Sequence, residues 1–375
     1  MIRLRGVAAD PGTTVAAVTN EAIQEPIRWG ILATGKIAHA FARDLMLVPG
    51  AELAAVGSRR LAAAESFAEQ YAEANGRPIL AHGSYQELVA DPDVDVIYIA
   101  TPHALHLENA QLAFEGGKHV LCEKPLTLSV ADSEQMIGLA RQHGRFLMEA
   151  MWTACHPGVR ALRRRLAAGE FGTPRHLHAE IGFVVQASPD DRMLNPDLGA
   201  GALLDMGIYP LTFAHLMLGE ATALTAQADL RVATGTESGR EGAIDMAIAM
   251  TGRYAGGALA TMHASMQSWA SDGAVIATDR GRIELAEFYH PSRITFTPQA
   301  EMSDWTATGA ELEPIAIEPD EPVIGTGYGN EALEVGRCLR AGVLESPLVP
   351  HSQTLTLMRQ MEELRQLTGI RYPAE

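Results

Sequence analysis

The alternation of short apolar runs with helical segments over residues 27–150 constrains the fold more than any other feature of this sequence. The β-like runs are "IRWGILA", "AELAAVGS", "RPILAHG", "VDVIYIATP", "KHVLCEKP" and "RFLMEAMW", and helix-forming stretches such as "RLAAAESFAEQYAEAN" separate them. Strands that alternate with helices favour βαβ units, in which neighbouring strands run parallel and helices cover both faces of the sheet. We therefore predict an α/β Rossmann domain with a parallel sheet over 27–150.

The character of the sequence changes after Trp152, where β-rich runs follow one another with few helices between them. Successive strands of this kind favour a largely antiparallel sheet. Because 375 residues exceed what one core usually holds, we predict a second, α+β domain over 151–375. Helical patterns near 329–341 and 351–368 close the chain, and these helices could pack back on the first domain.

Residues 1–26 are rich in Gly, Pro, Thr and Ala and lack a sustained apolar core. We expect a flexible N-terminal arm here, the alternative being an arm that packs against a partner subunit. The stretch is a poor signal peptide, and no apolar run approaches the ~20 residues of a membrane span.

The formal net charge of −17 argues against nucleic acid and anionic membrane surfaces as partners, because both require a basic footprint. The three cysteines are widely spaced and odd in number, which suggests neither a disulfide framework nor a zinc site. A reducing cytoplasm is the expected location.

An incomplete dinucleotide fingerprint follows the first apolar run. The three glycine positions of G-x-G-x-x-G are occupied by Ala33, Gly35 and Ala38, between a predicted strand and a predicted helix. Gly35 stands where backbone must approach a pyrophosphate closely. The pattern by itself fits either a cofactor turn or a plain strand–helix junction. The candidate cofactor contacts here are Ala33, Thr34, Gly35, Lys36 and Ile37.

The second predicted strand ends in "AVGSRR", where an NAD site usually carries an acidic residue for the ribose hydroxyl. Ser58, Arg59 and Arg60 stand there instead. A hydroxyl and guanidinium groups suit the 2′-phosphate of NADP, so we predict NADP as the cofactor, with NAD possible. The alternative is that these arginines are solvated surface cations.

Two further groups lie at the carboxyl ends of predicted strands, where ligands bind in open sheets. Thr101, Pro102, His103 and His106 follow the most apolar run, and we place them near the cofactor. A zinc site would need a third ligand, and none is spaced for it, so we predict no metal.

Glu123 and Lys124 end the next strand in "VLCEKP". A lysine between apolar runs needs a partner or a task, and acid–base chemistry is one such task, the alternative being a surface Glu–Lys pair. Farther along, Asp205 and Tyr209 are spaced i and i+4 in a helical pattern and share a face. They suit proton transfer. The alternative is a helix with a polar stripe whose side chains form hydrogen bonds within the fold and take no part in chemistry.

Taken in order, "GILATGKIAHAFARDL", "TPHALHLENA", "VLCEKPLT", "FLMEAMWT", "GAGALLDMGIYPL" and "RCLRAGVLESPLVP" resemble the Gfo/Idh/MocA oxidoreductases. Within that family the chain is most similar to the branch of trans-1,2-dihydrobenzene-1,2-diol dehydrogenases and NADP-dependent D-xylose dehydrogenases. The resemblance implies a large, mostly antiparallel open sheet in the second domain, whose open face commonly forms a homodimer or homotetramer interface.

The same resemblance implies hydride transfer between a nicotinamide and a carbinol or carbonyl of a sugar or cyclic diol. Lys124 and Tyr209 would be the acid–base pair, Asp205 their supporting carboxylate and Arg59 the reader of the 2′-phosphate. The bond before Pro125 would be cis. Two alternatives remain: a sugar–sugar oxidoreductase with tightly bound NADP, and a non-catalytic sugar- or nucleotide-sensing regulator.

The substrate end departs from the family pattern. Trp152 is retained as a wall of the site, but Ala154 and Cys155 follow it, where similar proteins often carry an arginine and an aromatic residue. Arg192 stands where the family often places an arginine near the substrate. The expected substrate contacts are therefore Trp152, Arg192, Asp205 and Tyr209, and the substrate itself stays open.

Overall fold

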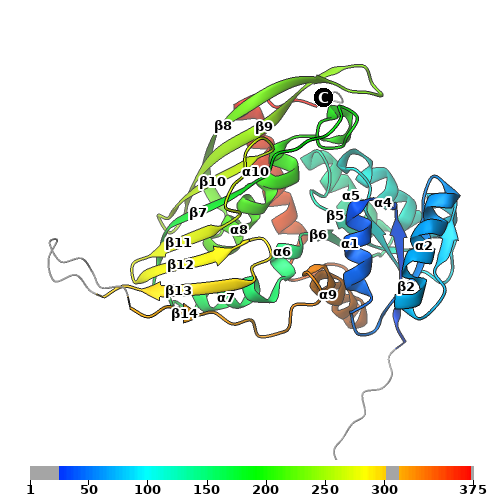
Figure 1. The fold of residues 1–375 in the computed structure, drawn as a ribbon, viewed down its shortest axis with the longest axis horizontal. Helices are drawn as coiled ribbons and strands as arrows, with labels where there is room; N and C mark the ends of the chain where they lie inside the picture. The colour runs from blue at the N-terminus through cyan, green and yellow to red at the C-terminus, as the bar shows by residue number, and fades with distance from the viewer. Residues whose placement is uncertain (1–24, 301–311, 373–375) are drawn as a thin grey trace, which may run out of the picture.

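The computed structural model describes residues 25–300 and 312–372 and contains two sheets. Figure 1 shows the smaller sheet with its helices on one side of the molecule and the larger sheet on the other. The predicted N-terminal arm lies outside the described residues except for its last two positions.

The first sheet is parallel and six-stranded, in the order β3-β2-β1-β4-β5-β6. The predicted Rossmann-type fold class is confirmed. The strands are β1 (Ile27–Leu32), β2 (Ala51–Gly57), β3 (Leu80–His82), β4 (Val96–Ile99), β5 (His119–Glu123) and β6 (Leu147–Ala150). The intervening helices are α1 (Lys36–Leu45), α2 (Leu61–Asn75), α3 (Tyr85–Ala90), α4 (His106–Glu115) and α5 (Val130–Gln142).

Both faces of this sheet are buried, which explains why its strands read as nearly continuous apolar runs. Trp29 and Tyr98 belong to the core cluster on one face, and Ile97 and Phe114 belong to the cluster on the other. Adjacent residues of one strand, Ile97 and Tyr98, thus point to opposite faces and both are fully buried.

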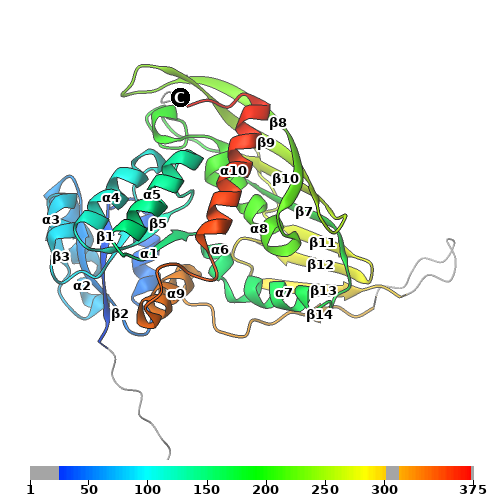
Figure 2. The ribbon, with the colours of Figure 1, turned by 180° about the vertical axis from the view of Figure 1, so that it is seen from behind.

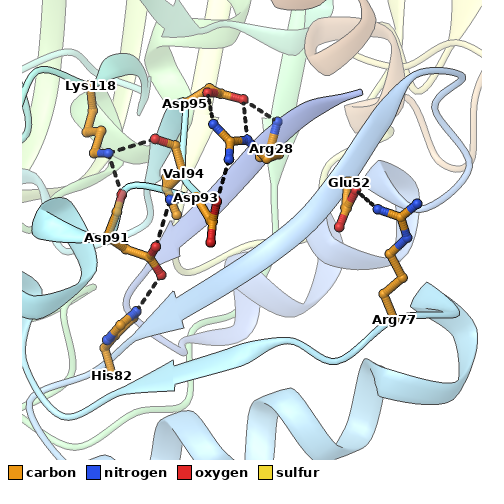
Figure 3. Close-up of polar contacts among 9 residues, drawn as sticks. All are labelled: Arg28, Glu52, Arg77, His82, Asp91, Asp93, Val94, Asp95 and Lys118. Carbon is orange, nitrogen blue, oxygen red and sulfur yellow. Dashed lines mark hydrogen bonds and ion pairs between the residues drawn. The ribbon is translucent and has the colours of Figure 1, made fainter. Parts of the chain in front are cut away.

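A polar clasp joins the amino ends of the central strands (Figure 3). Arg28 at the start of β1 pairs with Asp95 at 2.8 Å and with Asp93 at 2.7 Å. The ammonium of Lys118, just before β5, donates to the carbonyl oxygens of Asp91 at 2.5 Å and Val94 at 2.7 Å. These contacts tie β1 and β5 to the loop that enters β4.

The second sheet has eight strands in the order β14-β13-β12-β11-β7-β10-β9-β8. Its recorded pairs are antiparallel except for β7 with β10, so the expected mostly antiparallel sheet is confirmed. The strands are β7 (Pro174–Gly182), β8 (Ala221–Thr234), β9 (Glu241–Tyr254), β10 (Leu259–Ser265), β11 (Ala274–Thr278), β12 (Gly281–Ala286), β13 (Arg293–Pro298) and β14 (Ile315–Ala316).

Helices fill the space between the two sheets. Figures 1 and 2 show α8 (Ile208–Leu218) and α10 (His351–Thr368) on the face of the large sheet that looks toward the Rossmann domain, with α7 (Pro157–Ala167) near β13. A short π-helical turn, Leu203–Gly207, leads into α8. By length and composition the stretch Pro196–Leu218 could cross a membrane, but 89% of its most apolar window is buried inside the fold, so it is a core segment.

The end of the chain returns to the Rossmann domain. Helix α9 (Tyr328–Ala341) packs on α1, and α10 packs on α5. The carboxylate of Asp44 in α1 accepts hydrogen bonds from the backbone N–H groups of Thr326 and Tyr328, at 2.7 and 3.0 Å. These contacts fasten the segment before α9 to the Rossmann domain.

Candidate active site

A cleft of about 1240 Å³ opens at the carboxyl ends of the parallel strands, where the Rossmann domain faces the second domain. It gathers nearly all of the residues predicted as a site from the sequence. They are Ala33, Thr34, Gly35, Lys36, Ile37, Ser58, Arg59, Arg60, Thr101, Pro102, His103, Glu123, Lys124, Trp152, Arg192, Asp205 and Tyr209.

His106 is the predicted cofactor residue that the cleft does not include. Its ring is 0% exposed and lies against the backbone, with Nε2 2.9 Å from the carbonyl oxygen of Thr101 and Nδ1 3.1 Å from that of Pro125. Direct contact with a ligand in the cleft is therefore closed to this side chain. The ring instead ties the loop after β4 to the loop after β5.

The glycine turn has the geometry that a phosphate group needs. Gly35 is the N-cap of α1, no side chain caps this helix, and its first turn carries no acidic residue. A Cβ added at Gly35 would meet no atom within 4 Å, so this position faces the open cleft. The free N–H groups and the positive end of the helix dipole thus point where an anion can bind.

The two alanines of the turn differ in their surroundings. Ala33 has φ = 85°, a left-handed conformation that usually belongs to glycine and costs an alanine roughly 1 kcal/mol. Ala38 is fully buried in the first turn of α1, where a small side chain permits close packing of helix and strand.

The end of β2 supplies cations and no acid. Arg59 and Arg60 are exposed and line the cleft, Arg59 beside Tyr85, and Ser58 is buried below them. Within the described residues no carboxylate pairs with either arginine, and α2 likewise has no acidic residue in its first turn. This corner of the cleft can therefore accept a further phosphate group.

Lys124 and Asp205 meet across the domain boundary. The Lys124 ammonium donates to the backbone carbonyl of Asp205 at 2.7 Å and lies 3.6 Å from its Oδ1. Arg192 donates to the same Oδ1 at 2.7 Å. Burial alone would raise the pKa of Asp205, but Lys124, Arg192 and His103 together hold it well below its ordinary value. Asp205 is thus an anion between two cations, and the peptide bond from Lys124 to Pro125 is cis.

Tyr209 completes this group. Its ring lies 4.7 Å from the Lys124 Nζ, and its hydroxyl oxygen accepts a hydrogen bond from Trp152 Nε1 at 3.1 Å. Burial, with the negative charge of Glu123, raises the pKa of the Tyr209 phenol well above its ordinary value. The phenol keeps its proton at neutral pH. Because an indole only donates, the Tyr209 O–H must point away from Trp152.

Two buried groups adjoin Lys124 from the Rossmann side. Glu123 accepts hydrogen bonds from the Tyr98 hydroxyl and from the Lys124 N–H, and burial raises its pKa. Burial lowers the pKa of His103 to about 3, so the ring is neutral. The His103 Nδ1 lies 3.2 Å from the Gly199 carbonyl and so carries the proton. Its Nε2, 3.9 Å from Asp205 Oδ1, is left as an acceptor.

The sequence reasoning missed the aromatic wall opposite these charges. Tyr328 stacks on Trp152 with ring centroids 4.1 Å apart and an interplanar angle of 5°, and His290 stacks on it at 5.0 Å. Tyr289 packs against Tyr209 at 5.3 Å. The only local signals were aromatic residues beside turn formers in "FYHP" and "GTGYGN". A mostly apolar segment at the end of β7 and after it also lines the cleft and was not predicted; it consists of Ile181 and residues 183–187, with Phe183 and Val184 partly exposed.

Across residues 25–300 and 312–372, no group of three or more His, Cys, Asp or Glu side chains is placed to hold a metal ion. The cleft brings together an uncapped helix start, a cationic corner at the end of β2 and the group Lys124, Asp205 and Tyr209.

Comparison with known families finds matches along most of the chain. Residues 27–151 match an oxidoreductase family with an NAD-binding Rossmann fold, named GFO_IDH_MocA, and residues 159–284 match the GFO/IDH/MocA C-terminal domain.

Individual relatives and solved structures agree with these matches. A D-xylose 1-dehydrogenase (NADP(+)) of Hypocrea jecorina is 33% identical over 374 residues, with 92% of this chain and 93% of the relative covered. A trans-1,2-dihydrobenzene-1,2-diol dehydrogenase of Mus musculus is 32% identical, with 93% and 99% covered. In structure, an aldose-aldose oxidoreductase from Caulobacter crescentus, 23% identical, has a TM-score of 0.74, with 92% of this chain and 98% of that chain covered.

Proposed function

Because this chain belongs to the Gfo/Idh/MocA family of oxidoreductases, we propose that it transfers a hydride between NADP and a carbinol or carbonyl carbon of a sugar or cyclic diol. The family resemblance predicted from the sequence is thereby confirmed. The observation that supports the proposal most directly is that the glycine turn and the group Lys124, Asp205 and Tyr209 line one cleft.

The residues of the turn and of the β2 corner fit NADP. The uncapped start of α1 and the open space at Gly35 suit the pyrophosphate, and Arg59 with Ser58 suits the 2′-phosphate. When bound, NADP supplies the hydride acceptor or donor. The NADP dependence carried in the name of the Hypocrea jecorina relative supports the same cofactor.

Lys124 and Tyr209 act as the acid–base pair for the substrate oxygen. In oxidation the carbinol carbon gives up a hydride with its electron pair and the C=O bond forms. The hydroxyl proton passes to the Lys124–Tyr209 unit, which accepts it after releasing one proton of its own to water, because the Tyr209 phenol otherwise keeps its proton. In reduction the Tyr209 O–H, directed away from Trp152, donates to the new alkoxide oxygen. The Lys124 Nζ lies 4.7 Å from the centre of the Tyr209 ring, so the two groups act on the substrate oxygen as one unit. Asp205 orients Lys124, and Arg192 holds Asp205.

The test combines a substrate screen with two substitutions. The wild type is assayed with pentoses, hexoses and cyclic diols, using NADP for oxidation and NADPH for reduction. Tyr209→Phe and Lys124→Met are each expected to lower turnover by ~10²- to 10⁴-fold, the range of general acid–base catalysis, while NADPH still binds. Tyr254→Phe, a buried tyrosine outside the cleft, is the matched control and keeps wild-type turnover.

Other outcomes separate the alternatives. Near-native rates in both variants would remove the acid–base assignment. A nicotinamide absorbance that survives purification, with turnover only when one sugar is oxidised and another reduced, would indicate a sugar–sugar oxidoreductase. NADP binding without turnover on any substrate would indicate a sensing regulator.

The outer face of the large sheet supports self-association. In Figures 1 and 2 the helices lie on the inner side of this sheet, and Leu259 on β10 is 49% exposed. In the loop after β10, Trp269 is 79% exposed, which is unusual for a large aromatic side chain. The proposed assembly is a homodimer or homotetramer through the outer face of the sheet, and sedimentation velocity of the wild type and of Leu259→Glu tests it. The described cysteines are all buried and free, which agrees with a cytoplasmic location.

A further inference from the structure

We propose that Asp245, a buried carboxylate outside the cleft, is a positioning residue that sets the turn carrying Asp205 and thereby places the ammonium of Lys124. The inference rests on the proposed function, because it assigns Asp245 a role through Lys124 and Tyr209. It concerns a residue in strand β9 that lines no part of the cleft.

Asp245 holds the start of the π-helical turn. One carboxylate oxygen, Oδ2, accepts the backbone N–H of Leu203 at 2.7 Å, and Leu203 is the first residue of that turn. The side chain is 0% exposed, and its other oxygen, Oδ1, has no hydrogen-bond partner among the described residues. A buried carboxylate with one oxygen that lacks a hydrogen bond lowers the stability of the fold. Such a residue is therefore a candidate for a functional role.

The segment before the π-helical turn leaves space for the Asp245 carboxylate. Gly201 has φ = 128°, and a Cβ there would lie 2.4 Å from Asp245 Oδ1. Only glycine therefore fits both the backbone conformation and the space. Two residues earlier, the Gly199 carbonyl receives the Nδ1–H of His103. The segment that leads to Asp205 is thus held at two points, one in each domain.

The hydrogen-bond register of the turn leaves the Asp205 carbonyl oxygen free to accept the Lys124 ammonium. The N–H of Ile208 reaches back five residues to Leu203, which is the π register. In that register the partner of the Asp205 carbonyl would be residue 210, which is proline and has no N–H. The oxygen instead accepts the Lys124 ammonium at 2.7 Å, while the Asp205 carboxylate lies 3.6 Å from the same nitrogen.

These contacts connect Asp245 to Lys124 through the π-helical turn. Asp245 fixes Leu203, the π register then turns the Asp205 carbonyl toward the Rossmann domain, and Lys124 is held by it beside Tyr209. Loss of the Leu203 contact would let the turn relax toward the ordinary helical register. The carbonyl of Asp205 would then pair within the helix, and the ammonium of Lys124 would lose its fixed place.

The first experiment compares Asp245→Ala with Asp245→Asn. The alanine variant removes the acceptor for Leu203 N–H, and we expect kcat to fall on the order of 10- to 100-fold, as for a misplacement of about 1 Å, with NADPH affinity unchanged. The asparagine variant keeps an acceptor oxygen, so it should recover most of the loss. The pH profile of kcat should change in the alanine variant and not in the asparagine variant, because only the alanine variant loses the oxygen that holds the turn.

A matched control separates positioning from stability. Asp91 is also a buried carboxylate that accepts a backbone N–H, from Asp93 at 2.8 Å, but it belongs to the clasp of Figure 3 and lines no part of the cleft. Asp91→Ala should lower the melting temperature without changing kcat or the pH profile of the folded enzyme. If Asp245→Ala behaves in the same way, the inference is overturned.

A second variant tests the register without removing a buried charge. Pro210→Ala restores an N–H that can bond within the turn, so it should preserve or raise the melting temperature and still lower kcat. Unchanged kcat in Pro210→Ala overturns the inference even if Asp245→Ala fails to fold. Lys124→Met separates the failure of this inference from a failure of the proposed function. If Lys124→Met is inactive while Asp245→Ala and Pro210→Ala keep the wild-type kcat, Asp245 has no positioning role and the proposed function stands.

Discussion

The two ends of the parallel sheet treat charge in opposite ways. At the amino end, Arg28 pairs with Asp93 and Asp95, and the Lys118 ammonium donates hydrogen bonds to two backbone carbonyl oxygens (Figure 3). At the carboxyl end, the described residues offer no carboxylate to Arg59 or Arg60, and the start of α1 is uncapped. The sheet thus pairs its cations at the amino end, whereas Arg59 and Arg60 at the carboxyl end of β2 have no carboxylate partner among the described residues. Lys124, at the end of β5, is the exception at the carboxyl end, because it is paired with Asp205.

The difference predicts which polar groups serve folding and which serve binding. Paired groups gain their stabilisation in the folded protein alone, whereas open donors gain it only when a ligand arrives. Substitutions at the amino end should therefore change the free energy of unfolding and leave cofactor affinity alone. Substitutions at the carboxyl end should do the reverse.

The largest effect is expected from Gly35→Val. The added side chain would stand in the open space at the start of α1, where backbone must approach the pyrophosphate, so NADPH affinity should fall at least ~100-fold. No atom lies within 4 Å of the new Cβ, so the fold should persist. Fluorescence titration with NADPH measures the affinity, and circular dichroism measures the melting temperature.

Gly138→Val is the control for this change. Gly138 is an exposed position in α5 whose Cβ would also meet no atom within 4 Å, but it is remote from the cleft. Its NADPH affinity should equal that of the wild type. Retained affinity in Gly35→Val would mean that the turn does not hold the cofactor.

A smaller effect is expected from Arg59→Ala. Loss of a charge-assisted contact with the 2′-phosphate should weaken NADP binding by ~10- to 100-fold and leave NAD binding unchanged. Isothermal titration with both nucleotides gives the comparison. Arg77→Ala, which removes an exposed guanidinium paired with Glu52, should change neither value. A wild type that prefers NAD would contradict the cofactor assignment.

The smallest effect is expected from Asp95→Asn at the amino end. Burial would raise the pKa of Asp95, but its hydrogen bonds with Arg28 lower that pKa below the ordinary value of 3.8. A depressed carboxyl pKa stabilises the fold above 3.8, and this stabilisation is lost as the pH falls through the folded-state pKa. For a partly exposed pair the substitution should cost about 1 kcal/mol at pH 7, and the difference from wild type should shrink in acid.

Urea unfolding from pH 7 downward measures this difference, with NADPH affinity as the control. An equal loss of stability at every pH would show that the ion pair is not its source. A change in NADPH affinity would break the comparison between the two ends of the sheet.

Local patterns were enough to predict much of the fold. The alternation of apolar runs and helices over 27–150 matches β1 to β6 and their helices, because each strand is buried on both faces and each helix has a polar outer side. Residues next to strand ends, such as Gly35, Arg59 and Lys124, were found because the carboxyl ends of parallel strands meet at one edge.

Features that depend on distant contacts were not predicted. The stacking of Tyr328 and His290 on Trp152 joins three segments far apart in the chain, and no periodicity reports it. The parallel pairing of β7 with β10 and the π register at Leu203 are likewise set by neighbours from other strands. His106 was placed beside the cofactor because of its sequence position, whereas its burial is a tertiary property.

The return of the last segments to the first domain has a consequence for synthesis on the ribosome. The edge strand β6 gives its Leu147 N–H to the carbonyl of Leu344, and the Leu128 carbonyl accepts from Arg365 in α10. With the Asp44 contacts, these bonds require residues that are translated later, by 237 positions for Arg365 and by 282 for Thr326. The Rossmann domain is therefore synthesised first, but its contacts are completed only after the last helices have been translated. Until then the edge of β6 is unpaired at Leu147 and accessible to chaperones.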